Sequence, residues 1–144
     1  MTTGGSKGLR TAVDPAALAR AIEERLGVPP GRQVEEYGMT ELSSQAYTGA
    51  LRAGLGEDDA GTGFHAPPWT RTRIVDPLTG VDLPTGELGA LVHWDLANRG
   101  SALAVQTSDV GARAAGGTFL LRGREPGAEA RGCSLAADLW LGRS

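Results

Sequence analysis

The chain contains little cysteine, little net charge and no long apolar run. Its single cysteine excludes an internal disulfide and is typical of a reducing compartment, so we expect a cytoplasmic protein. The net charge of −3 gives no electrostatic reason to expect nucleic acid or an anionic membrane as a partner. No apolar stretch approaches the roughly 20 residues that span a bilayer, and the N-terminus lacks the apolar core of a signal peptide.

Glycine, by contrast, is abundant, with 22 residues in a chain of 144. This content predicts many tight turns and few long helices. The hydrophobic and charged fractions, 40% and 22%, are ordinary for a soluble globular protein. We therefore expect one globular domain built from short elements.

One helix is predicted clearly, because Asp14 and Pro15 suit its N-cap and first position and Gly27 suits its C-cap. Between them runs an apolar stripe at helical spacing, formed by Leu18, Ala21, Ile22 and Leu26. A weaker helix is expected over residues 42–53. Strands are expected at 33–37, 70–75, 88–96, 102–106 and 118–121, with turns at 76–80 and 83–86. The order predicts an α+β fold, a β-rich meander with one or two helices.

The motif Tyr37-Gly38-Met39-Thr40-Glu41 begins at the end of the strand expected over residues 33–37. A glycine between an aromatic and a polar pair suits a strand end that opens into a loop near a ligand. Tyr37 offers a flat face to a planar ring, Thr40 a hydroxyl to a phosphate, and Glu41 a carboxylate to Mg²⁺. The alternative interpretation is an ordinary strand and turn with an exposed glutamate.

Two further polar residues are placed near expected strand ends. Asp109, in Gln106-Thr107-Ser108-Asp109, could accept two hydrogen bonds from a ribose diol, or could simply begin a turn. Arg124 could bind a ribose or a phosphate, or could lie on the surface. 

Histidine and cysteine give weaker signals. His93 is expected to be a packed or edge residue of a strand rather than a base, and His65 has too few neighbouring ligands for a metal site. Cys133 is a nucleophile if Arg131 lowers the pKa of its thiol, and otherwise an inert buried thiol. 

Taken together, several short motifs resemble one family, the acyl-protein synthetases that activate fatty acids in bacterial bioluminescence. The motifs are Tyr37-Gly38-Met39-Thr40-Glu41, Pro67-Pro68-Trp69, Thr85-Gly86-Glu87-Leu88-Gly89, Trp94-Asp95-Leu96-Ala97-Asn98, Gln106-Thr107-Ser108-Asp109, Gly123-Arg124 and Arg131-Gly132-Cys133-Ser134-Leu135. That family resembles a branch of the adenylate-forming ligases. Residues 1–144 are similar to the C-terminal part of such an enzyme, with a hinge near residues 123–124 and an acyl-acceptor tail at 125–144.

The resemblance implies ATP and Mg²⁺ as cofactors and a fatty acid as substrate. The residues implied to bind the nucleotide are Gly4, Gly5, Tyr37, Gly38, Thr40, Asp109 and Arg124. Glu41 is implied to hold Mg²⁺, and Thr40 and Glu41 to assist formation of an acyl-adenylate. Cys133 is implied to accept the acyl group as a thioester.

Two departures from the family pattern leave alternatives open. Ser108 stands where adenylate-forming ligases have a glycine, and no lysine follows Lys7, although most of the superfamily uses a C-terminal lysine for adenylation. The chain could therefore be a truncated or split non-catalytic subunit, or a fragment of an acyl- or aryl-CoA ligase in which Cys133 stays unacylated. Expected partners are an acyl reductase or a separate N-terminal half.

Overall fold

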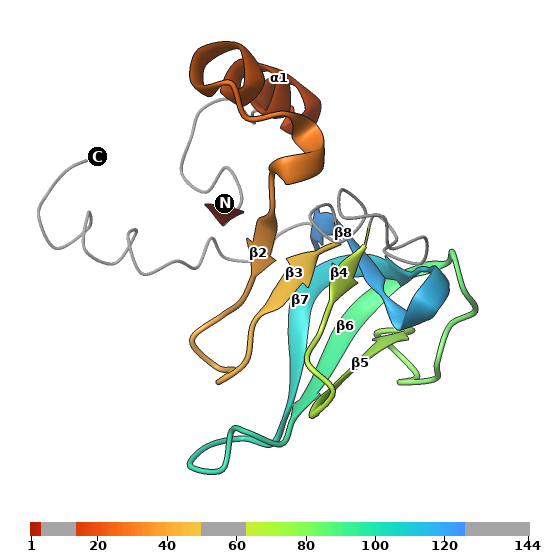
Figure 1. Ribbon diagram of the computed structural model, residues 1–144. Coiled ribbons are helices and arrows are strands. Elements are labelled where there is room, and N and C mark those ends of the chain that lie inside the picture. The colour runs from red at the N-terminus through yellow and green to blue at the C-terminus, as the bar shows by residue number, and fades with distance from the viewer. Residues whose placement is uncertain (4–13, 50–62, 126–144) are drawn as a thin grey trace, which may run out of the picture.

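The computed structural model describes residues 1–3, 14–49 and 63–125 (Figure 1), and the fold is given for these residues. They contain one α-helix, α1 (Pro15–Leu26), and two short 3-10 helices, η1 (Pro30–Arg32) and η2 (Ala115–Gly117). The strands are β1 (Thr2–Thr3), β2 (Glu35–Tyr37), β3 (Ala46–Thr48), β4 (Phe64–His65), β5 (Thr70–Val75), β6 (Leu88–Asp95), β7 (Ala104–Arg113) and β8 (Phe119–Arg124). The predicted α+β class is confirmed.

All eight strands form one mixed sheet in the order β1-β2-β3-β4-β8-β7-β6-β5. β1 and β2 are parallel, and every other neighbouring pair is antiparallel. Strands β5 to β8 form the expected meander. The last strand, β8, lies between β4 and β7, so it joins the earlier strands to the meander.

The sheet curls until its two halves face each other. Tyr37 on β2 lies with its ring centroid 5.5 Å from that of His93 on β6, although four strands separate β2 from β6 in the sheet order. Figure 1 shows β4 in front of β6 and β7, with β3 and β2 beside it. The core fills the space inside this curl and contains Tyr37, Ala46, Phe64, Ile74, Leu91 and Phe119.

Two of the many glycines allow the strands of the meander to pack closely. A Cβ atom at Gly111 would lie 2.2 Å from the Leu120 carbonyl oxygen, and one at Gly89 would lie 2.4 Å from the Val75 carbonyl oxygen. Both clashes involve backbone, which cannot move aside without opening the sheet. Any side chain at these positions would therefore distort the pairing of β5 with β6 or of β7 with β8.

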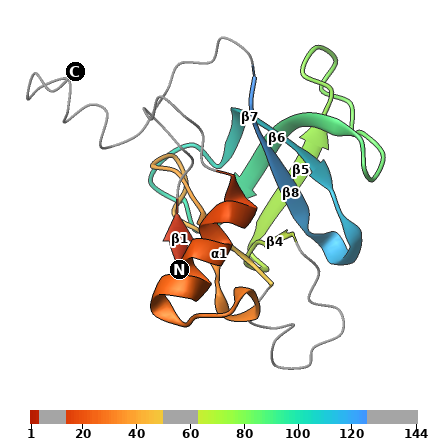
Figure 2. The same ribbon diagram turned by 90° about the horizontal axis from the view of Figure 1, so that it is seen from above.

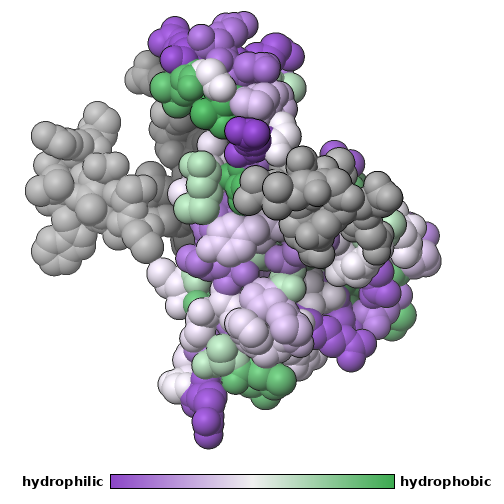
Figure 3. Space-filling model, in the orientation of Figure 1, coloured by the Kyte–Doolittle hydropathy of each residue, from purple (hydrophilic) through white to green (hydrophobic). Residues whose placement is uncertain are grey.

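The helix α1 forms as its sequence predicts. Asp14 accepts hydrogen bonds from the Ala16 and Ala17 N–H groups, and Gly27 ends the helix at φ 67°. None of its residues is buried, and Leu26 is 72% exposed. Figure 2 shows α1 on the side of the sheet that holds β1, and Figure 3 shows hydrophobic residues (green) beside hydrophilic ones (purple) at this end of the molecule. 

Two expectations about local structure are wrong. The expected helix over residues 42–53 does not form in its described part, because residues 46–48 pair with β2 and β4 as β3. Asp109 does not follow a strand but lies inside β7, which runs further than the expected 102–106. No helix among the described residues is long and apolar enough to cross a membrane.

Candidate functional site

Asp109 lies where the ladders on both sides of β7 are irregular. The register between β6 and β7 shifts between Ala90 and Val92, opposite the stretch that holds Asp109. The register between β7 and β8 shifts between Val110 and Gly111. Such bulges redirect side chains and are common next to binding sites. Ser108 does not adopt a positive φ, so serine rather than glycine at this position causes no backbone strain.

Arg124 lies directly opposite Asp109 in the pairing of β7 with β8. Its Nε is 3.2 Å from Asp109 Oδ1, so the two side chains form an ion pair. Gly123, immediately before it, has φ 132°, a conformation that favours glycine. The sequence Gly123-Arg124 therefore places the guanidinium beside the carboxylate that was expected to bind a ribose.

Tyr37 joins this pair from the other half of the sheet. Its hydroxyl donates to Asp109 Oδ2 at 2.8 Å and lies 3.2 Å from His93 Nε2, while His93 Nδ1 lies 3.0 Å from Thr72 Oγ1. Burial, and then the Asp109 charge, raise the pKa of Tyr37, so its hydroxyl remains a proton donor. Burial also lowers the pKa of His93 to about 4, so its imidazole is neutral at pH 7.

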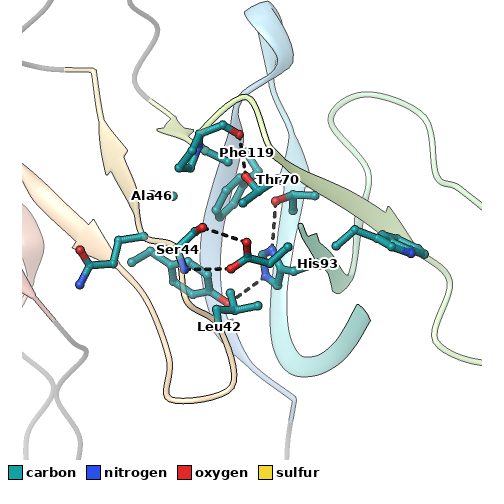
Figure 4. A pocket seen from close by; sticks show the side chains of 13 residues that line it. Leu42, Ser44, Ala46, Thr70, His93 and Phe119 are labelled. Atoms are coloured by element: carbon teal, nitrogen blue, oxygen red, sulfur yellow. Dashed lines mark hydrogen bonds between the residues drawn. The ribbon is translucent and has the colours of Figure 1, made fainter. Parts of the chain in front are cut away.

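The ring of Tyr37 is itself part of the core, with 8% of the residue exposed. It lies against Phe64 and Phe119, with ring centroids 5.9 Å and 5.5 Å away. A neighbouring pocket, shown in Figure 4, has Ser44 and His93 pointing into it from opposite sides. Its volume of about 20 Å³ suits one water molecule rather than an adenine. The adenine contact of Tyr37 stays a prediction.

Thr40 and Glu41 lie on the exposed loop between β2 and β3. The Thr40 hydroxyl donates to Glu41 Oε2 at 3.0 Å. A Cβ at Gly38 would meet the flexible Glu36 carboxylate at 2.5 Å, which can move aside. Glu41 thus presents a hard oxygen donor to solvent, as Mg²⁺ binding requires, although the described residues contain no group of three or more possible metal ligands.

Sequence reasoning gave no role to two residues that hold this loop. Asp95, at the end of β6, is fully buried and accepts hydrogen bonds from the Ser43 and Ser44 backbone. Asn98 donates to the Glu41 carbonyl oxygen at 2.8 Å. The only signal in the sequence is the motif Trp94-Asp95-Leu96-Ala97-Asn98, which is one of those that resemble the acyl-protein synthetases. A carboxylate and an amide at a strand end, three residues apart, could have suggested a loop anchor.

Of the remaining predicted site residues, Gly4, Gly5 and Cys133 lie outside the described residues. The structure brings together Tyr37, Asp109 and Arg124 in one cluster. It places Thr40, Glu41 and Gly38 on a separate, exposed loop that continues from the strand of Tyr37. His93, expected to be a packed or edge residue rather than a base, is packed, since 4% of it is exposed.

No protein-family model matches the sequence, and no curated protein matches it. Solved structures do resemble it. The amide bond synthetase McbA from Marinactinospora thermotolerans is 23% identical at a TM-score of 0.53, over 78% of this chain and 24% of McbA. ATP-bound MatB from Rhodopseudomonas palustris is 24% identical at 0.52, over 75% of this chain and 24% of MatB.

A luciferase-like enzyme from the mealworm Zophobas morio gives a TM-score of 0.58 at 16% identity, over 89% of this chain and 31% of that enzyme. The chain thus spans between a quarter and a third of these proteins. The solved structures that it resembles are adenylate-forming ligases. The described sheet has the fold of the C-terminal part of their ligase domain.

Proposed function

We propose that this chain is the C-terminal part of an ATP-dependent ligase that activates a fatty acid as its acyl-adenylate and transfers the acyl group to Cys133. In the first step, a carboxylate oxygen of the fatty acid attacks the α-phosphorus of ATP, and pyrophosphate leaves. In the second, the Cys133 thiolate attacks the acyl carbonyl carbon, forms a thioester and releases AMP. 

The observation that carries the proposal is the cluster of Asp109, Tyr37 and Arg124 on a ligase fold. One carboxylate oxygen of Asp109 receives the Tyr37 hydroxyl and the other faces Arg124, so its position is fixed on both sides. A carboxylate held in this way is suited to accept hydrogen bonds from the two hydroxyls of a ribose. Tyr37 and Gly38 would border the adenine, and Arg124 would contact the ribose or α-phosphate.

The loop after β2 would serve the phosphates. The Thr40 hydroxyl would donate to a phosphate oxygen, and the exposed Glu41 carboxylate would hold Mg²⁺ together with the phosphates. A magnesium ion bound there would supply positive charge to neutralise the charge that develops on the phosphate oxygens. One carboxylate plus substrate phosphates is a usual magnesium site in proteins that bind nucleotides.

Transfer to Cys133 is supported by the match of Arg131-Gly132-Cys133-Ser134-Leu135 to acyl-protein synthetases. The test is intact mass spectrometry of the 144-residue chain after mixing with synthetic fatty acyl-AMP, beside Cys133→Ala and a denatured control. We expect an acyl adduct on the folded wild type that hydroxylamine removes and that both controls lack. An adduct that persists in Cys133→Ala, or its absence on a folded chain, would overturn the assignment of Cys133.

A second candidate is a ligase that passes the acyl group to coenzyme A. The likeness to adenylate-forming ligases fits both candidates, because adenylation precedes transfer in each, and only the short motif around Cys133 favours the protein acceptor. Adding coenzyme A to the same mixture separates the two functions. Acyl-CoA formation without any protein adduct would favour the CoA ligase.

A further inference from the structure

We propose that Asp95 and Asn98 are positioning residues that hold the loop carrying Thr40 and Glu41 in the geometry with which it meets the phosphates of a nucleotide. This rests on the proposed function, because the loop needs a fixed geometry only if Thr40 and Glu41 bind phosphate and Mg²⁺. Asp95 is the last residue of β6 and Asn98 lies in the turn region that follows it, and both are buried on the inner side of the loop.

The carboxylate of Asp95 is surrounded by donors. Its Oδ2 accepts from the backbone N–H groups of Ser43 and Ser44 at 3.0 and 2.8 Å. Its Oδ1 accepts from the Ser44 hydroxyl at 2.9 Å and from the Ala97 N–H at 3.0 Å. With four donors and no exposed surface, Asp95 must be ionised and acceptor-only to satisfy its neighbours.

Asn98 holds the loop at Glu41, which precedes the two serines bound by Asp95. Its Nδ2 donates to the carbonyl oxygens of Glu41 and Ala102, at 2.8 and 2.9 Å, and its Oδ1 accepts from the Ser43 hydroxyl at 3.1 Å. The amide group therefore uses both donors and its acceptor. Because the Glu41 carbonyl is fixed from within, the backbone of Glu41 is fixed while its side chain stays in solvent.

A purely structural reason for this arrangement is weak. Hairpin loops usually span about two to five residues, whereas the connection from β2 to β3 spans residues 38–45. Closing a long exposed loop does not require a buried carboxylate, since desolvating a charge is costly and apolar contacts would serve as well. Converging donors on one buried carboxylate instead fix backbone orientation, which is what a preorganised binding loop requires.

These hydrogen bonds give the loop an inner side that is bound to the protein and an outer side that is exposed. The Ser43 and Ser44 amides face inward to Asp95, and the Thr40 hydroxyl and Glu41 carboxylate are exposed. Without Asp95 or Asn98 the loop would have to be ordered by the nucleotide itself, and that ordering reduces affinity. The loss should fall on groups that bind phosphate and leave the adenosine contacts of Tyr37 and Asp109 unchanged.

The test compares the wild-type chain with Asp95→Asn and Asn98→Ala, and with Asp82→Asn as the matched control. Asp82 is an exposed carboxylate that pairs with Arg73 and Arg113 rather than with residues of the loop. Amide hydrogen exchange is followed by mass spectrometry in a peptide that spans residues 39–45 and in peptides from β5 to β8. Affinities for MgATP and for adenosine are measured by titration on the same samples.

We expect exchange in the loop peptide to become about tenfold faster in both variants, with the strand peptides unchanged. We expect the Kd for MgATP to rise about tenfold and that for adenosine less than about twofold, as for residues that support a ligand group from behind. Asp82→Asn should match the wild type in every measurement. If Asp95→Asn loosens the whole sheet, Asn98→Ala, which leaves the Asp95 carboxylate in place, decides the outcome.

Two results would overturn the proposal in different ways. A loosened loop with unchanged MgATP affinity would show that the anchor is structural only, and the proposed function would stand. Wild type that binds adenosine but not MgATP would remove the phosphate role of Thr40 and Glu41, and the positioning role with it. Wild type that binds neither would overturn the proposed function for this chain.

Discussion

The meander β5–β8 and the helix α1 are held by opposite kinds of interaction. Ile74, Val75 and Leu91 in the meander are at most 1% exposed, and they lie on paired strands, with Ile74 opposite Leu91. None of the twelve residues of α1 is buried, and the helix is defined by its own caps, Asp14 and Gly27. The sheet therefore depends on burial and the helix on local hydrogen bonds.

The difference shows that a clear sequence signal is not the same as a large contribution to stability. The signal for α1 was among the strongest in the chain, yet Leu18 and Leu26 remain 42% and 72% exposed in the structure. The signal for the core strands was weaker, yet they carry the buried apolar surface. Three predictions test this difference between the sheet and the helix.

The largest effect is expected from Leu91→Ala, in the middle of β6. Leu91 has no exposed surface, so its removal loses the burial of an apolar side chain and leaves a cavity. We expect the free energy of unfolding to fall by about 3 kcal/mol or more. Urea unfolding followed by tryptophan fluorescence measures it, and Leu26→Ala on α1 is the control, expected to change stability by less than about 0.5 kcal/mol.

Protonation of His93 in acid should lower the free energy of unfolding of the sheet. Its pKa is lowered to about 4 in the fold, against 6.5 in the unfolded chain, so below pH 6.5 the unfolded state binds more protons. The free energy of unfolding should fall by about 2 kcal/mol between pH 7 and pH 5 and level off below pH 4 for this group. 

The measurement is urea unfolding at several pH values, beside His93→Gln, which cannot titrate. A slope between pH 7 and pH 5 that is the same in both proteins would contradict the assignment to His93.

The ionisation of Asp95 should affect the free energy of unfolding only at lower pH. Burial opposes its ionisation, but its four hydrogen bonds prevail and lower its pKa, so its contribution is lost as pH falls below the unfolded value of 3.8.

The smallest effect is expected from Asp14→Ala, which removes the cap of α1. The lost hydrogen bonds to the Ala16 and Ala17 N–H groups should cost about 1 kcal/mol, and this loss should be confined to the helix. Hydrogen exchange should become faster in a peptide from α1 and stay unchanged in β5–β8. Faster exchange in the meander would mean that α1 and the sheet unfold as one unit.

Much of the fold could be predicted because its signals are local. Asp14, Pro15 and Gly27 gave the helix, and strand β5 was placed at Thr70–Val75 as the structure has it. The turn at residues 76–80 forms because Asp76 accepts from the Leu78 and Thr79 N–H groups. Each of these features is decided by residues within a few positions of one another.

The wrong predictions concern features that depend on contacts between residues far apart in the sequence. The stretch after Leu42 has helical spacing of apolar residues, but pairing with β2 and β4 makes it the strand β3. Asp109 looked like a strand end, yet pairing with β8 extends β7 beyond it. The cluster of Tyr37, His93 and Asp109 depends on the curl of the sheet, which no local pattern encodes.

The place of β8 in the sheet has a consequence for synthesis on the ribosome. It is the last of the eight described strands to be made, yet it alone joins β4 to β7, and it meets β4 at the single pair Phe64 and Phe119. Until it emerges, the nascent chain carries two unpaired strand edges, at β4 and β7, which are templates for aggregation. Successful production of this protein will therefore depend on a late, long-range closure, and slower growth at lower temperature should raise the soluble yield.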